Sequence, residues 1–109
     1  MVARRLQELP RREVIGFSFP VASGPRSRTL GLAGLERGEA GGGLLIPRCA
    51  SVHTFGMRFA LDLVFLDQDD VPLSVRIRVP PRRFAWQLGA AAVLELPSRE
   101  GGENRARRT

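Results

Sequence analysis

Apolar and polar residues alternate along several short segments of the chain, which predicts β-strands with one buried face. The segment from Val71 to Val79 is the clearest, with an apolar residue at every odd position and Pro, Ser or Arg between them. Val14 to Val21 has the same period of two, and Pro20 favours a place at the edge of a sheet. Ala90 to Leu96 is the last segment of this kind. The pattern therefore predicts a mainly β chain.

One segment is apolar on both faces. Phe59 to Leu66 has apolar residues at odd and even positions, which predicts a central strand covered on both sides. The polar turn Asp67 to Asp70 then joins it to the alternating strand that follows, as a hairpin. Leu44 to Ile46 and Ser51 to Phe55 are two further short strands.

Helical signals are sparse. Pro25 stands at the start of a possible short helix with Ser23 or Gly24 as its cap, and Glu36 to Gly43 is predicted to be a glycine-rich loop. Short strands separated by turns predict a mainly β fold, a small β-sandwich or barrel-like single domain with at most one short helix.

The length of 109 residues is that of one domain with one core. We expect residues 1–12 to be a flexible lead-in, residues 13–97 to form the β domain, and residues 98–109 to be a disordered tail. No apolar run is long enough to cross a bilayer, so we expect no membrane partner. Cys49 is the only cysteine, which precludes an internal disulfide, and we expect a soluble cytoplasmic protein.

The net charge of +6 is concentrated at the ends of the chain. Residues 1–13 and residues 98–109 each carry four arginines against two glutamates, so the body of the chain holds little of the excess. Solubilising ends are the favoured interpretation. The alternative is weak nucleic-acid binding through these ends and Arg76, Arg78, Arg82 and Arg83. We do not favour it, because the chain has no RNA-recognition signature.

The segment Cys49 to Asp67, with the sequence CASVHTFGMRFALDLVFLD, resembles the uncharacterised family DUF192, a domain of unknown function. The flanking Gly43-Leu44-Leu45 and Leu94-Glu95-Leu96-Pro97 fit the family as well. This resemblance implies a compact β-sandwich-like fold and no activity, because the family has none assigned. The chain departs from the family pattern at Asp69-Asp70, where members commonly have Asp-Gly, at Ser98, and in residues 100–109.

His53 is the only histidine, and it shares a predicted strand face with Ser51 and Cys49. One hypothesis makes His53 the general base of a hydrolase-like enzyme with Ser51 or Cys49 as its nucleophile. The favoured interpretation is a histidine that forms structural hydrogen bonds, since no nucleophile-elbow motif is present.

Asp62 interrupts the apolar run of the predicted central strand, so its carboxylate needs a partner or water. Arg58 is about 13 Å away along a regular strand, too far for direct contact. A structural ion pair and the wall of a ligand pocket are equally plausible interpretations of Asp62.

The leading functional hypothesis is a non-enzymatic binding module for a small polar or anionic ligand. Its site residues would be His53, Phe55, Met57, Arg58 and Asp62, with Arg58 as the charged anchor. One histidine and one cysteine do not make a zinc site, and the acidic turn lacks the pattern of a calcium loop. We therefore expect no metal and no cofactor, and the oligomeric state does not follow from the sequence.

Overall fold

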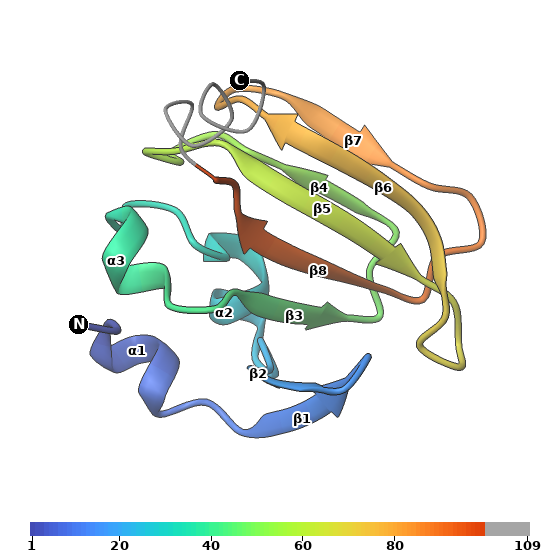
Figure 1. Cartoon of the computed structure of the whole chain (residues 1–109), viewed down its shortest axis with the longest axis horizontal. Coiled ribbons are helices and arrows are strands. Elements are labelled where there is room, and N and C mark those ends of the chain that lie inside the picture. The colour runs from blue at the N-terminus through green and yellow to red at the C-terminus, as the bar shows by residue number, and fades with distance from the viewer. Residues whose placement is uncertain (100–109) are drawn as a thin grey trace, which may run out of the picture.

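Eight short strands and three short helices make up the computed structural model, which describes residues 1–99. In chain order they are α1 (Arg4–Gln7), β1 (Arg11–Val14), β2 (Phe17–Pro20), α2 (Pro25–Leu30), α3 (Arg37–Ala40), β3 (Leu44–Pro47), β4 (Ser51–His53), β5 (Leu61–Leu66), β6 (Pro72–Val79), β7 (Phe84–Trp86) and β8 (Ala92–Pro97) (Figure 1).

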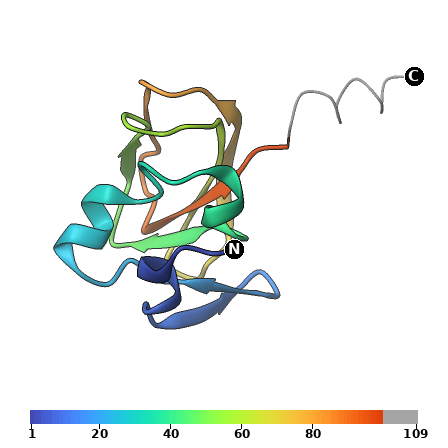
Figure 2. The same cartoon turned by 90° about the vertical axis from the view of Figure 1, so that its left-hand side faces the viewer.

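The largest sheet has four antiparallel strands in the order β3-β8-β5-β6. The strand latest in the chain, β8, thus lies inside the sheet, between β3 and β5 (Figure 1). Two smaller antiparallel pairs, β1-β2 and β4-β7, complete the strands. The three helices gather at one side of the molecule, which faces the viewer in Figure 2.

The two inner strands of the large sheet supply side chains to two cores, one on each face. From β5, Leu61, Leu63 and Phe65 enter the first core, which includes residues of α1, α3 and the segment after α2. The alternate residues Val64 and Leu66 enter the second core, against the β1-β2 hairpin. The predicted central strand with two covered faces is therefore confirmed.

The mainly β single domain is confirmed, but two details of the predicted fold are wrong. The described strands form open antiparallel sheets rather than a barrel, and residues 1–99 contain three short helices rather than at most one. Helix α3 lies in the predicted glycine-rich loop, where Glu36 and Glu39 form a capping box. Such a four-residue helix depends on its cap and has no room for apolar periodicity.

The N-terminal region is also more structured than expected. Residues 1–12, predicted to be a flexible lead-in, contain α1 and the start of β1, and Leu6 of α1 is buried in the first core. The predicted strand from Val14 to Val21 is instead a hairpin. Its turn is made by Ile15 and Gly16, both in the left-handed region with φ of 52° and 82°, as a two-residue hairpin turn requires.

The expected tail begins with a buried residue. Ser98 is 1% exposed, and its backbone N–H donates to the carbonyl of Ala60. The rest of that prediction, from residue 100 onward, lies outside the described residues. Across residues 1–99, no helix is both long enough and apolar enough to span a membrane.

Gly43, at the start of β3, gives a test of the contact between β3 and β8. A Cβ there would lie 2.5 Å from the backbone oxygen of Glu95, and the φ of +125° is strained for other residues. We expect Gly43→Ala to lower the free energy of unfolding by about 3 kcal/mol, measured by urea denaturation. The neighbouring Gly42 has no atom within 4 Å of such a Cβ, so Gly42→Ala is the matched control. Equal losses in the two variants would contradict this account.

Candidate functional site

A pocket of about 190 Å³ opens between α2, β4 and the inner strand β8. Its polar lining comes from four separate parts of the chain, namely α2, the loop before β4, β4 itself and β8. The lining residues are Arg28, Thr29, Leu30, Gly31, Ile46, Cys49, Ser51, Val52, His53, Met57 and Glu95.

Glu95 is the most unusual residue of this pocket. It is 2% exposed, and it stands on the first-core face of β8, where its antiparallel neighbours are Leu44 and Leu63. Its Oε1 atom is buried and has no hydrogen-bond partner among residues 1–99. Buried polar groups without partners are rare in folded proteins, so this carboxyl group is available to something that enters the pocket.

Burial also changes the acid strength of this group. It raises the pKa of the Glu95 carboxyl from 4.5 to about 7, although a hydrogen bond from the backbone of Leu32 lowers the pKa. The carboxyl group is therefore close to half ionised at neutral pH, which is uncommon for a glutamate and typical of functional sites.

The Glu95 carboxyl group lies close to the backbone of Gly31, at the end of α2. Gly31 follows that helix with a φ of +54°, and a Cβ at this position would lie 2.8 Å from Glu95 Oε1. The absence of a side chain at Gly31 therefore gives the carboxylate its place beside the pocket.

Arg28 of α2 brings the opposite charge to the same pocket. One terminal nitrogen of its guanidinium donates to the carbonyl of Arg48 at 2.7 Å, which fixes the side chain. Its Nε is buried and has no hydrogen-bond partner among the described residues. The pocket thus contains a donor and an acceptor that the described protein leaves unpaired.

His53 lines the pocket from β4. Its Nδ1 accepts the backbone N–H of Phe55 at 3.2 Å, so the proton of the neutral ring is on Nε2. The ring also packs near Phe55, with centroids 5.9 Å apart. His53 therefore serves this pocket as a hydrogen-bond donor.

Cys49, Ser51 and Met57 complete the part of the pocket that the sequence had singled out. The Cys49 thiol donates to the backbone carbonyl of Ser51. Met57 is 7% exposed and belongs to the first core as well as to the pocket wall. The structure thus brings His53 and Met57 together with both hypothetical nucleophiles.

The other three predicted site residues lie outside this pocket. Phe55 is exposed and packs edge-on against Phe84, with centroids 5.2 Å apart. Arg58 is also exposed, and its guanidinium pairs with Glu36 at 2.8 Å. Neither side chain lines the pocket that contains His53.

Asp62 also has partners elsewhere. Its Oδ1 accepts the backbone N–H of Arg78 at 2.9 Å and the hydroxyl of Ser98. Arg78 has a φ of 57° and lies where the pairing of β5 with β6 is irregular. The Asp62 carboxylate therefore holds a distorted stretch of sheet through backbone and hydroxyl donors, with no ion pair to Arg58 or His53.

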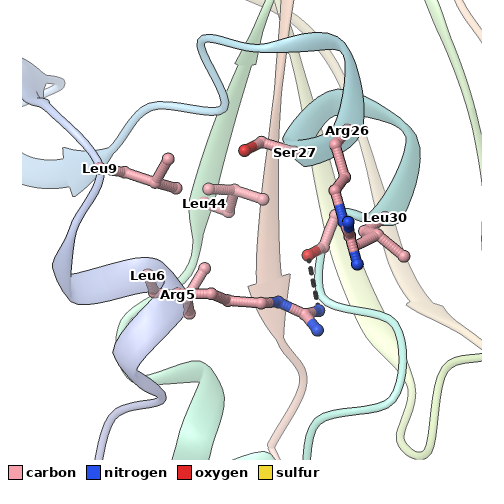
Figure 3. Close-up of a pocket in the computed structure, with 8 residues that line it drawn as sticks. Arg5, Leu6, Leu9, Arg26, Ser27, Leu30 and Leu44 are labelled. Carbon is pink, nitrogen blue, oxygen red and sulfur yellow. Dashed lines mark hydrogen bonds between the residues drawn. The ribbon is translucent and has the colours of Figure 1, made fainter.

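A second, smaller pocket of about 90 Å³ lies between α1 and α2 (Figure 3). Leucines dominate its lining, with Arg5 and Arg26 on one side. Arg5 donates to the carbonyls of Gly31 and Ala33 at 3.2 Å and 2.6 Å, so its guanidinium ties α1 to the segment after α2. Because that arginine is already engaged, this pocket is the weaker candidate for a ligand site.

Sequence reasoning missed Arg28 and Glu95. The one signal in the sequence was that Glu95 lies inside the run Val93 to Leu96, which has apolar residues on both faces of the strand. Among residues 1–99, no group of three or more His, Cys, Asp or Glu side chains is placed to hold a metal ion.

Comparison with known proteins identifies the family. The sequence profile of DUF192, described as "Uncharacterized ACR, COG1430", matches residues 9–104. The chain belongs to the DUF192 family. No curated protein matches the sequence.

A solved structure shares the fold. It is the crystal structure of a protein of unknown function from Novosphingobium aromaticivorans, with a TM-score of 0.60 and 16% sequence identity over 100% of this chain and 94% of that chain. At this identity the likeness concerns the fold alone. Neither the DUF192 family nor the solved structure has an assigned function, so a functional proposal for this chain must be based on the pocket.

The raised pKa of Glu95 predicts a pH dependence of stability. Because the folded protein binds this proton more tightly than the unfolded chain, stability contributed by Glu95 is full below about pH 4.5 and is lost as the pH rises to about 7. We expect a loss of about 3 kcal/mol across this window, relative to Glu95→Gln, which cannot titrate. Urea denaturation of both proteins across this pH range measures the difference. A difference that does not vary with pH would contradict the prediction.

The structural role of Asp62 is tested by two substitutions. Asp62→Ala removes the acceptor for both the Arg78 N–H and the Ser98 hydroxyl, and we expect it to lower the free energy of unfolding by about 2 kcal/mol. Asp62→Asn keeps a side-chain oxygen, so it should restore at least about half of that loss. Thermal or urea unfolding provides the measurement. If Asn were as damaging as Ala, the negative charge and not the acceptor would be the stabilising feature.

Proposed function

We propose that this DUF192 domain is a binding module for a small polar ligand, held in the pocket between α2, β4 and β8. The observation that carries the proposal is the buried Glu95 carboxyl group, whose Oε1 has no partner among the described residues. A ligand that donates to this oxygen would supply the hydrogen bond that it lacks. Because the oxygen is shielded from water, such a bond would contribute strongly to the binding free energy.

The charged anchor in this proposal is Arg28 rather than Arg58. Arg58 is exposed and occupied by Glu36, whereas Arg28 lines the pocket and has an unpaired Nε. His53 retains its predicted role as a ligand-contacting residue, with its Nε2–H as the donor. Met57 supplies apolar wall.

Binding accounts for the geometry better than hydrolysis does. A general base needs a free imidazole lone pair directed at the nucleophile. In His53, Nδ1 already accepts the N–H of Phe55, and Nε2 carries the proton. The Cys49 thiol is directed at the carbonyl of Ser51. A hydrolase-like role for His53 with Ser51 or Cys49 would therefore need a different tautomer and a rearranged loop.

The pocket can be tested by NMR with the full-length, isotopically labelled chain and a library of small fragments that includes neutral, anionic, cationic and zwitterionic compounds. We expect binding to shift the backbone amides of Gly31 and His53, which line the pocket, and that of Leu32, which hydrogen-bonds to Glu95. Arg28→Gln, His53→Gln and Glu95→Gln should each weaken the best fragment by about tenfold, because the first and last remove a charge from the pocket lining and the second removes the imidazole donor.

The matched control is Arg58→Gln, which removes an arginine outside the pocket and should leave the affinity within about twofold. Fragment shifts that map away from the pocket would overturn the proposal. So would pocket variants that bind as well as the Arg58→Gln control does.

A further inference from the structure

We propose that the ligand of this pocket is a small zwitterion of amino-acid size, with its amine against Glu95 and its carboxylate against Arg28. This inference rests on the proposed function and adds the chemical class of the ligand.

The charges of the pocket lining support this class. Arg28 and Glu95 are the only arginine and the only acidic residue among the lining residues. Each has one buried polar atom without a partner, Nε in the arginine and Oε1 in the glutamate. The lining therefore offers one unpaired cationic donor and one unpaired carboxyl acceptor.

These two groups do not neutralise each other. The ion pairs formed within residues 1–99 are Arg12 with Asp70 and Arg58 with Glu36. Because Arg28 and Glu95 share a pocket without forming a pair, a ligand that carries a single charge would satisfy only one of the two unpaired atoms. A ligand with both charges satisfies both. Compensation matters most for Glu95, which is 2% exposed, because a buried charge is stable only when it is compensated.

The polarity of the neighbouring residues fits the same orientation. His53 donates from Nε2, because its Nδ1 is occupied by the N–H of Phe55. Arg28 and His53, two lining residues with an N–H donor left free within residues 1–99, are therefore suited to a carboxylate. Glu95 is the acceptor that complements an ammonium group.

The size of the pocket limits the ligand. Its volume of about 190 Å³ is slightly larger than the cavity of roughly 150 Å³ that holds one benzene molecule. A molecule of roughly five to ten heavy atoms fits inside this space, which is the size range of amino acids and smaller than a nucleotide or a peptide.

The test compares zwitterions with their single-charge and neutral analogues at about pH 8, where Glu95 is ionised. The zwitterions are glycine, β-alanine and γ-aminobutyrate, which differ in the separation of the two charges. The analogues are propylamine, propionate and propionamide. Affinity is measured by NMR titration of the full chain, following the amides of Leu32 and His53.

We expect one zwitterion to bind at least about tenfold more tightly than any of the three analogues. Glu95→Gln should abolish its advantage over propionate, because the variant has lost the partner of the amine. Arg28→Gln should abolish its advantage over propylamine, because that variant has lost the partner of the carboxylate. The exposed Arg58→Gln variant should preserve both advantages.

The possible outcomes separate this inference from the proposed function. If propionate, propylamine or propionamide binds in the pocket as tightly as the best zwitterion, the zwitterion assignment is overturned and the binding module stands. If none of the probes and none of the library fragments shifts the pocket amides, both are overturned. Loss of the zwitterion advantage in Arg58→Gln would also overturn the assignment.

Discussion

The burial of β5 and β8 on both faces is the constraint on which the rest of the structure depends. Each of these strands pairs along both edges and packs on both sides, so most of the side chains they carry enter a core or a cavity. Apolar residues suit this environment at most positions. Glu95 does not, and the protein accommodates it beside Gly31 and a pocket rather than in a closed core. The candidate site is thus a direct result of the order of the strands.

The strands of this sheet could largely be predicted from the sequence, because their apolar residues follow recognisable patterns. The apolar run of β5 and the alternation of β6 predicted both strands and the hairpin between them. The predicted buried face of β6 is wrong, because β6 is an edge strand whose Leu73, Val75 and Ile77 are 44%, 53% and 69% exposed. The hairpin of β1 and β2 was missed because Ile15, a β-branched residue, occupies a left-handed position where glycine or asparagine is usual. Helices α1 and α3 were missed because four residues hold no helical period, and β7 was missed because three residues hold hardly any alternation.

The site was harder to predict than the fold, and two acidic residues show why. Asp62 and Glu95 both interrupt apolar strands, and both lie in the middle of the sheet. Asp62 has hydrogen-bond donors from Arg78 and Ser98, which come from distant parts of the chain. Glu95 has an oxygen without any partner among the described residues. Both are acidic residues between two leucines, so the difference depends on tertiary contacts that no single sequence displays.

The position of β8 also affects how the protein forms during synthesis. Strands β3 and β5 are made first, but they are not neighbours, because the place between them belongs to the strand that ends at Pro97. On the ribosome, the large sheet therefore stays open along its middle until almost the entire described chain has left the exit tunnel. Arrival of β8 closes the sheet and brings Glu95 beneath α2 in the same step. A nascent chain that stops before this strand has neither a completed core nor a ligand pocket.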